Sequence, residues 1–158
     1  MRRALVVTVS DGVAAGTRED SSGALLEERL AALDFAVERA AVPDEQERIA
    51  STIVTAADGG VSLVVTTGGT GLGPRDRTPE AVSSVIEYLV PGFGEAMRSV
   101  GRTHTPLASL SRSLGGVRGG CLILCLPGSP SGAAESIDAV ADLLDHALRM
   151  VAGRTSHG

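Results

Sequence analysis

The sequence predicts an α/β fold of three layers, in which helices cover both faces of a mostly parallel sheet. Three observations predict it: aliphatic runs alternate with segments of helical periodicity, those runs are apolar almost without a break, and aromatic residues make up only 2% of the chain. Strands buried on both faces of a parallel sheet read as such runs, and the crossover between two parallel strands is normally a helix. A chain of 158 residues without a repeat or a linker is expected to form one domain, residues 1–158, with a frayed tail at 154–158.

The first half of the chain predicts three strands and two helices. The expected strands span residues 4–9, 35–42 and 61–67. The second of these strands alternates apolar and charged residues imperfectly, which is typical of a strand near the edge of a sheet. The polar stretch 10–22 is expected to be a long loop, and a helix capped within residues 20–22 follows it, with leucines at helical spacing. A second helix is expected between Pro43 and Ala57.

The second half of the chain predicts three helices and one strand. A helix is expected to start at Thr78, with Thr78 as its cap and Pro79 in its first turn. A short helix is expected after the chain break at 91–94, whereas the polar stretch 101–113 fits no regular element. The aliphatic run 121–126 is the last expected strand, and the final helix carries a continuous apolar stripe.

Charge and composition exclude several classes of function. The net charge of -5 and the isoelectric point near 5.1 argue against nucleic acid as the main partner, because phosphate backbones attract basic surfaces. All 14 basic residues are Arg, so no Lys is available to form a Schiff base or to hold a phosphate as in a Walker loop. No segment approaches the roughly 18 apolar residues of a membrane helix.

The two cysteines predict a reducing compartment. In one strand, Cys121 and Cys125 would lie about 13 Å apart, at about 3.3 Å per residue, whereas a disulfide requires Cα atoms within about 7 Å. They are therefore interpreted as small core residues. Because the N-terminal segment also lacks the pattern of a signal peptide, we expect a cytoplasmic protein without a membrane partner.

A glycine-rich loop is the first candidate binding element. Residues 66–71 read Thr-Thr-Gly-Gly-Thr-Gly and lie between an expected strand and an expected helix. Glycines let backbone N–H groups approach phosphate oxygens, and the start of the next helix favours negative charge. The loop is neither a Walker loop nor a Rossmann fingerprint, and a plain turn is the alternative interpretation. Since ligands of doubly wound sheets lie beyond the carboxyl ends of the strands, we expect this loop to bind a phosphorylated small molecule.

Two carboxylates are expected on the same rim as this loop. Asp76 lies five residues beyond Gly71, and Asp44 follows the second expected strand. A carboxylate beside a phosphate requires a bridging cation, so the pair is a candidate Mg²⁺ site. The alternatives are that Asp76 pairs with Arg75 or Arg77 in a solvated loop, and that Asp44 only caps a helix.

Other polar residues follow the expected strands on this rim. Ser10 and Asp11 come after the first strand, and the turn 127–130 joins the last strand to the final helix. The segment 111–113, Ser-Arg-Ser, offers hydroxyls and a guanidinium suited to phosphate, although an exposed Arg is more often only solvated. The three histidines show no metal-ligand spacing.

Seven short segments lie along the chain in a specific order and spacing. They are Val9-Ser10-Asp11, Asp20-Ser21-Ser22-Gly23, Val42-Pro43-Asp44-Glu45, Thr66-Thr67-Gly68-Gly69-Thr70-Gly71, Arg75-Asp76-Arg77-Thr78-Pro79-Glu80-Ala81, Leu110-Ser111-Arg112 and Leu126-Pro127-Gly128-Ser129-Pro130. In this order they resemble the molybdenum-cofactor adenylyltransferases of the MogA/MoaB type, which also occur as the G domains of plant and animal fusion proteins. Each segment alone is weak evidence, but the resemblance covers nearly the whole chain.

The resemblance implies the fold of the molybdenum cofactor biosynthesis proteins and an activity that uses Mg²⁺. The family transfers AMP from ATP to the terminal phosphate of molybdopterin, which gives adenylyl-molybdopterin and pyrophosphate. Its two critical aspartates, also the candidate Mg²⁺ ligands, fall on Asp44 and Asp76. The expected substrate-binding residues are Ser10, Asp11, Thr67, Gly68, Gly69, Thr70, Gly71, Arg75, Thr78, Ser111, Arg112, Pro127, Gly128 and Ser129. By analogy, Ser111 and Arg112 would help to bind the pterin side.

The resemblance also implies partners and leaves other functions open. A homotrimer is expected, with a molybdenum-insertion protein as a further partner. The main alternative is a non-catalytic molybdopterin-binding or carrier protein of the MoaB type, against which the presence of both Asp44 and Asp76 speaks. A nucleotide-processing module of the competence-damage type would need a second catalytic domain, and a structural scaffold would need additional regions.

Overall fold

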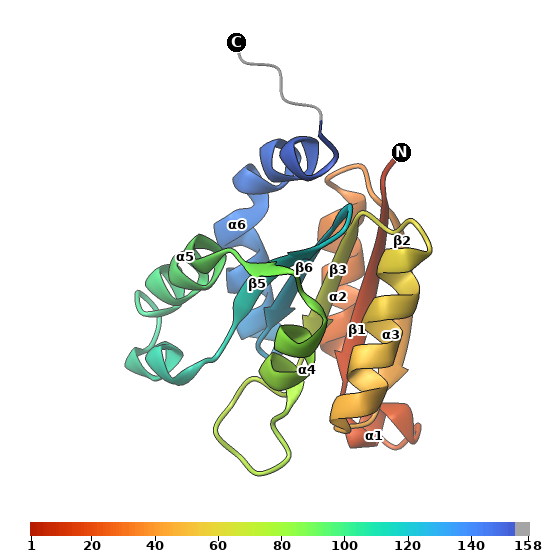
Figure 1. Cartoon of the computed structure of the whole chain (residues 1–158). Helices are drawn as coiled ribbons and strands as arrows, with labels where there is room; N and C mark the ends of the chain where they lie inside the picture. Colours follow the sequence, from red (N-terminus) through yellow and green to blue (C-terminus); the bar gives the residue numbers. More distant parts are fainter. Residues whose placement is uncertain (154–158) are drawn as a thin grey trace.

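The computed structural model describes residues 1–153, so the predicted frayed tail at 154–158 lies outside the described part of the chain. Six strands form a mixed sheet in the order β2-β1-β3-β6-β5-β4 (Figure 1). The strands are β1 (Arg3–Val9), β2 (Ala36–Val42), β3 (Leu63–Thr67), β4 (Tyr88–Leu89), β5 (Leu114–Arg118) and β6 (Cys121–Leu126). β1, β2, β3 and β6 run parallel, and β5 pairs antiparallel with β6 and β4. The mostly parallel sheet that the sequence predicted is confirmed.

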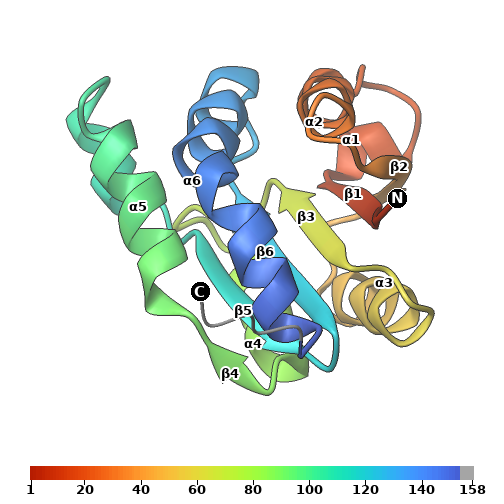
Figure 2. The same cartoon turned by 90° about the horizontal axis from the view of Figure 1, so that it is seen from above.

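Helices cover both faces of the sheet. They are α1 (Asp11–Ala14), α2 (Ser21–Ala31), α3 (Gln46–Asp58), α4 (Thr78–Val85), α5 (Pro91–Gly101) and α6 (Pro130–Val151), together with the 3-10 helix η1 (Pro106–Leu110). Helices α2, α5 and α6 pack on one face, and α3 and α4 pack on the other (Figure 2). This arrangement confirms the predicted three layers. Within residues 1–153, no helix combines the length and the apolar character that crossing a bilayer requires.

The central strand β6 shows why both faces need a cover. Its side chains alternate, so that Leu122 and Leu124 pack under α2, α5 and α6, while Ile123 and Cys125 pack toward α3 and α4. All of its residues are buried. An uninterrupted apolar run is therefore the consequence of two hydrophobic cores that share one strand. Conversely, β2 has only Val42 buried and ends the sheet, which confirms the predicted edge position.

The strand β5 was not predicted from the sequence. Glycine is depleted in strands, and β5 contains both Gly115 and Gly116. A Cβ atom on Gly115 would lie 2.8 Å from side-chain atoms of Leu124 and Phe93, and one on Gly116 would lie 2.6 Å from Ile86. Packing against the neighbouring strand and helices thus requires the same glycines that conceal the strand from a propensity argument.

Three further segments differ from expectation. The predicted loop 10–22 contains the short helix α1, and α5 continues to Gly101 rather than ending near Met97. The stretch 101–113, which fitted no element, contains η1 and a turn that leads into β5. These segments are short or polar, so their conformations depend on contacts with other elements rather than on local periodicity.

Both cysteines lie in β6, four residues apart, as predicted. Each is a free, buried thiol, and burial raises the pKa of Cys121 and of Cys125 to about 12. Thiols with such pKa values are protonated at neutral pH and are poor nucleophiles. The cysteines therefore contribute to packing and not to chemistry.

The shared strand gives a direct test of the core. We expect Leu124→Ala to lower the free energy of unfolding by about 2–5 kcal/mol, because it empties a fully buried position of the close-packed interior. The control is Leu33→Ala, at a leucine that is 40% exposed, for which we expect a change within about 0.5 kcal/mol. Denaturant unfolding of the two variants measures the difference, and similar losses would contradict this account of the core.

Candidate functional site

The carboxyl ends of β1, β2, β3 and β6 meet at one edge of the sheet, where a polar pocket has formed. The pocket has a volume of about 400 Å³ and lies between the loops that follow these strands and the N-terminal end of α2. We call it the loop pocket. Its lining includes Ser10, Asp20, Asp44, Thr67, Gly68, Gly69, Gly128 and Ser129. Six predicted substrate-binding residues and one predicted catalytic aspartate are thus brought together, as the parallel topology requires.

The glycine-rich loop is held tightly against the neighbouring strands. The Gly68 amide donates to the Leu126 carbonyl (3.0 Å), and the Thr67 hydroxyl donates to the Pro127 carbonyl (2.7 Å). Gly68 has a φ of +105°, and a Cβ atom there would collide with the carbonyl oxygen of Val9. Only glycine combines this backbone conformation with this close approach.

Thr78 fixes the other side of the loop. The fully buried Thr78 donates its hydroxyl to the Gly68 carbonyl (2.8 Å), and its amide donates to the Gly69 carbonyl (3.1 Å). The expectation that Thr78 caps α4 is wrong, because Arg77 holds the cap position and Thr78 is the first helical residue. Thr78 therefore ties the helix to the glycine loop instead of closing the end of the helix.

Several backbone amides at this edge have no partner within the described residues. The amides of Gly69, Thr70 and Gly71 donate to no acceptor in residues 1–153. Helices α2 and α6 also begin at this pocket, with Asp20 and Ser129 as their caps. Unpaired amides and helix N-termini attract anions, so this edge of the pocket is suited to phosphate oxygens.

A pair of carboxylates lies where the loops after β1 and β2 meet. The Asp11 amide donates to the Asp44 carboxylate (3.0 Å), and the Asp44 amide donates to the Asp11 carboxylate (3.0 Å). Arg75 donates two hydrogen bonds to Asp11, both of 2.9 Å. Asp44 does not cap α3, because Glu45 is the cap residue. The alternative interpretation of Asp44 as a simple helix cap is therefore wrong.

The pKa values of the two carboxylates are shifted in opposite directions. Burial raises the pKa of Asp44 above its ordinary value, the amide of Asp11 opposes this effect, and the negative charges of Asp11 and Asp76 add to it. The hydrogen bonds from Arg75 and from the Asp44 amide hold the pKa of Asp11 below its ordinary value. Asp44 thus carries an ionic charge that its own surroundings compensate poorly, and a bound cation would compensate it.

Asp76 lies in a loop whose backbone carbonyls accept hydrogen bonds from Arg112. The Asp76 carboxylate accepts a hydrogen bond from the Gly73 amide (2.8 Å) and forms no ion pair within residues 1–153. Arg112 donates to the carbonyls of Gly71 (3.0 Å) and Asp76 (2.9 Å) and to the carboxylate of Glu80 (2.6 Å). The proposed pairing of Asp76 with a neighbouring arginine is therefore not formed, and the guanidinium of Arg112 is engaged by the protein itself.

The acidic residues fit a Mg²⁺ site of limited size. Among residues 1–153 there is no group of three or more His, Cys, Asp or Glu side chains that would hold a metal ion alone. Mg²⁺ is commonly held by one or two carboxylates together with substrate phosphates and water. Asp44 and Asp76 are hard oxygen donors whose charges interact, so they match the protein share of such a site.

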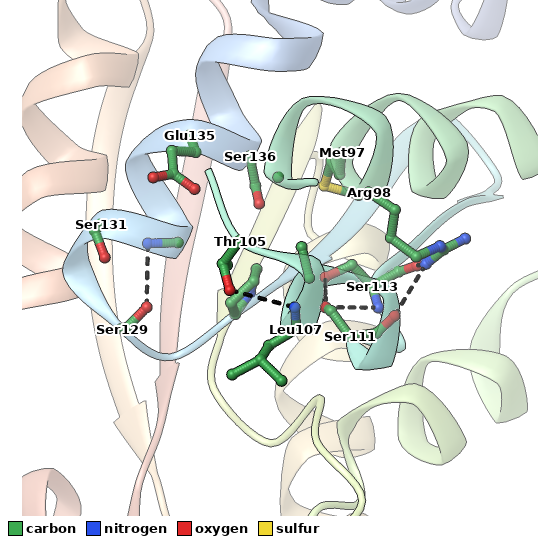
Figure 3. A pocket seen from close by; sticks show the side chains of 14 residues that line it. Met97, Arg98, Thr105, Leu107, Ser111, Ser113, Ser129, Ser131, Glu135 and Ser136 are labelled. Carbon is green, nitrogen blue, oxygen red and sulfur yellow. Dashed lines mark hydrogen bonds between the residues drawn. The ribbon is translucent and has the colours of Figure 1, made fainter. Parts of the chain in front are cut away.

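A second pocket, of about 260 Å³, shares Ser129 with the first. Figure 3 shows the residues that line it. It lies between α5, η1 and the first turns of α6, and we call it the helix pocket. Ser111 and Pro127 line it, whereas Ser129 lines both pockets. The Ser111 and Ser113 hydroxyls are 3.0 Å apart, and Arg98 donates to the carbonyls of both residues. Sequence reasoning predicted three residues of this pocket but not the pocket itself.

The loop pocket also contains an ion pair that was not predicted. Asp20 accepts from the Thr8 hydroxyl (2.8 Å), the Gly23 amide (3.0 Å) and the Arg39 guanidinium (2.8 Å). Burial alone would raise the pKa of Asp20, but the bonds from Arg39, Thr8 and Gly23 lower it below the ordinary value. The sequence identified Asp20 as a possible cap of α2, which is confirmed, and as part of one of the seven segments. It did not reveal the ion pair, because Arg39 lies on another element.

The fold and the site together define an α/β domain with a glycine loop whose amides have no acceptor within residues 1–153, an adjoining carboxylate pair and a second pocket beside it. Residues 5–146 match the family model described as "Probable molybdopterin binding domain", and the chain belongs to this molybdenum cofactor biosynthesis family. The resemblance seen in the sequence is confirmed.

Named relatives agree with this family. A molybdopterin adenylyltransferase of Escherichia coli K12 is 40% identical over 87% of this chain and 72% of its own length. A molybdenum cofactor biosynthesis bifunctional protein of Synechococcus elongatus is 42% identical over 98% of this chain, which spans 49% of that relative. The chain thus covers about half the length of the bifunctional relatives it matches. The molybdopterin biosynthesis enzyme MoaB of Thermus thermophilus superposes with a TM-score of 0.90 at 48% identity, covering 97% of this chain and 98% of that one.

The close approach of Gly68 to the Val9 carbonyl predicts that a methyl group destabilises the protein at this glycine but not at an unobstructed one. We expect Gly68→Ala to lower the free energy of unfolding by about 1–3 kcal/mol, because of the positive φ and the collision with Val9. The matched control is Gly92→Ala in α5, where a Cβ atom meets nothing within 4 Å and alanine is the better helix former. Thermal or denaturant unfolding measures the stability of both variants. Equal stability would contradict the close packing of Gly68 against Val9.

The Asp20 ion pair predicts a pH-dependent contribution to stability. A carboxylate with a lowered folded-state pKa stabilises the protein above its unfolded-state pKa of about 3.9, and this contribution is lost as the pH falls through the lower folded-state value. We therefore expect Asp20→Asn to be less stable than the wild type at pH 7, and the difference to shrink below about pH 4. Asp34→Asn, at an exposed position, is the control with the same change in charge. A difference that stays constant down to about pH 2 would contradict the role of the ion pair.

Proposed function

We propose that this chain is a molybdopterin adenylyltransferase, which transfers the AMP group of ATP to the terminal phosphate of molybdopterin. The observation that carries the proposal is the adjacency of two unlike pockets that share Ser129. One offers unpaired amides, helix N-termini and carboxylates, and the other offers a small, largely apolar space with serine hydroxyls at its rim. The name and the coverage of the E. coli relative support the same activity.

The pockets divide the two substrates between them. We assign the triphosphate of ATP to the loop pocket, where the amide of Gly69 and the N-terminus of α6 favour anions. The pterin belongs in the helix pocket, and the terminal phosphate of molybdopterin lies near Ser129, where the pockets meet. The engagement of Arg112 within the protein gives it a positioning role for the loop that carries Asp76, in addition to the predicted pterin contact.

The reaction requires positioning and charge compensation rather than a nucleophilic side chain. An oxygen of the molybdopterin phosphate forms a bond to the α-phosphorus of ATP, the bond from that phosphorus to the bridging oxygen breaks, and pyrophosphate leaves. Two anions must approach one another, so backbone donors and fixed charges are the appropriate catalytic groups. The absence of Lys is compatible with this mechanism, since no covalent enzyme intermediate is needed.

Asp44 and Asp76 would hold the Mg²⁺ that accompanies ATP. With Asp44 and Asp76 as its protein ligands, Mg²⁺ would supply compensation of the negative charge that develops on the leaving pyrophosphate. The raised pKa of Asp44 means that the free carboxylate is the more costly form, and the cation would favour it. Arg75 keeps Asp11 ionised and hydrogen-bonded, so that Asp44 stays in its position beside the phosphates.

The assembly and the compartment belong to the same proposal. Exposed apolar side chains on β4 and α6 support association of several copies, and the resemblance suggests a homotrimer; they are Tyr88, Leu89, Leu143 and Met150. The buried free thiols support a reducing compartment, the cytoplasm. A molybdenum-insertion protein would accept the adenylylated product.

Adenylylation of molybdopterin is the experiment that tests this function. Purified wild-type protein with molybdopterin, ATP and Mg²⁺ is expected to release pyrophosphate and to form adenylylated pterin, which chromatography resolves. We expect Asp44→Asn and Asp76→Asn each to lower the rate at least about 100-fold, because each removes a charge from the metal and phosphate site. Asp34→Asn, at an exposed position, is expected to keep the wild-type rate.

The same experiment distinguishes the alternative function. Tight binding of molybdopterin without product at any Mg²⁺ concentration would identify a carrier protein of the MoaB type instead. Hydrolysis of a nucleotide in the absence of any pterin would favour a nucleotide-processing module.

A further inference from the structure

The helix pocket contains one carboxylate to which the proposed reaction assigns no role. Glu135 lies in the second turn of α6 and lines the pocket, with Ser136 beside it and Thr105 and Leu107 on the opposite wall (Figure 3). It is the only acidic residue among those that line the pocket within residues 1–153. The one arginine of the lining, Arg98, directs a guanidinium nitrogen to two backbone carbonyls. Arg98 keeps its positive charge, but this nitrogen is occupied by the protein, and Glu135 supplies the one negative charge of the lining within residues 1–153.

The Glu135 carboxylate is partly buried and accepts no hydrogen bond from the described residues. Its side chain is 28% exposed, and the one basic side chain within 4 Å of it among residues 1–153 is His104, whose Nδ1 lies 3.7 Å from Oε1. That distance exceeds a hydrogen bond, and a carboxylate has room for about four donors. A carboxylate that lines a pocket and accepts no hydrogen bond from the protein is suited to accept hydrogen bonds from a ligand.

A pterin presents such donors in the correct pattern. The pyrimidinone ring of a 2-amino-4-oxopteridine carries the N3–H and the 2-amino group side by side, and a carboxylate accepts from two such parallel donors at once. Adenine places an acceptor, N1, next to its amino group, so a carboxylate meets one donor and one repelling lone pair. The pocket volume of about 260 Å³ lies below the common range of small-molecule sites, which fits one fused ring system rather than a whole nucleotide.

We propose that Glu135 selects the pterin by accepting hydrogen bonds from its N3–H and 2-amino groups, and that it excludes adenine from the helix pocket. The proposal rests on the assignment of the pterin to this pocket under the proposed function. Glu135 is then a specificity-determining residue that contacts the substrate far from the reacting phosphates. It sets which ring system enters, whereas the loop pocket sets where the phosphates lie.

Two pteridines that differ only at position 2 test this role. Pterin carries an amino group there and lumazine carries an oxo group, and both carry the N3–H. Fluorescence titration at a pH where both are neutral is expected to show that the wild type binds pterin at least about tenfold more tightly than lumazine, because the oxo group faces the carboxylate without a proton. Glu135→Gln offers one acceptor and one donor, which match lumazine, so we expect the preference to reverse.

Two control variants separate recognition from general effects. Glu95→Gln makes the same chemical change at an exposed position of α5 that does not line the pocket, and it is expected to keep the preference for pterin. His104→Gln removes the neighbour of Glu135 but keeps the carboxylate, and it is also expected to keep the preference. Since Glu135→Gln is expected to bind lumazine well, a loss of folding is distinguishable from a change of specificity.

The outcomes separate this inference from the proposed function. Adenylylation of molybdopterin by the same wild-type preparation, together with an unchanged pterin preference in Glu135→Gln, would overturn the role of Glu135 alone. Equal binding of pterin and lumazine by the wild type, or no binding of either, would also overturn it. Guanosine carries the same pair of donors as pterin, so tighter binding of guanosine would contradict the assignment of the pocket to a pteridine. Failure of the wild type to form any product would instead overturn the proposed function.

Discussion

The contact of Gly68 with the ends of β1 and β6 is the constraint on which the rest of the site depends. Gly68 is placed between the Val9 carbonyl and Gly128, whose Cβ position would lie 3.1 Å from the Gly68 Cα atom. Its amide and carbonyl are both engaged, by Leu126 and by Thr78. The amides that follow are then left without acceptors among residues 1–153, at the edge where the helices begin. The conformation of the loop thus results from the close packing of three strand ends.

Arginines organise the charges around this loop. Arg75 links the loop after β3 to Asp11, and Arg112 links the same loop to Glu80 and to the backbone of Asp76. Each guanidinium makes two or more directional hydrogen bonds, which a compact ammonium group cannot reproduce in the same planar geometry. The acidic pair Asp11 and Asp44 remains between these contacts, and one member has a raised pKa. A stable fold can hold such a pair because arginine compensates Asp11, while the Asp11 amide donates a hydrogen bond to Asp44.

Much of the fold and part of the site follow from local pattern. The buried strands are apolar without a break because helices cover both faces, so their runs in the sequence identify them. The predicted residues Ser10, Asp44, Gly68 and Ser129 converge because each follows a parallel strand, and parallel strands end on one edge. The strand β5 could not be predicted in this way, since its glycines are required by contacts with side chains far away in the sequence.

The helix pocket, in contrast, could not be predicted from local sequence pattern. Its walls come from α5, η1 and α6, and the residues that line it belong to two segments, 97–113 and 127–136, which β5 and β6 separate along the chain. Glu135 lies on an amphipathic helix, where a solvated glutamate is the ordinary interpretation. The position of Asp44 is similar, because a carboxylate before a helix suggests a cap, and only the reciprocal contact with Asp11 excludes that role.

The sequence alone determined the class of fold, the edge of the sheet where the polar loops meet and the family, because these depend on periodicity, on strand direction and on short motifs in a fixed order. Only the tertiary structure decided which carboxylates are compensated, that Arg112 acts on the protein itself, and that a second pocket adjoins the first. The physical reason is that burial, hydrogen bonding and ion pairing depend on the distances between elements, and these distances exist only after the helices have packed on the sheet.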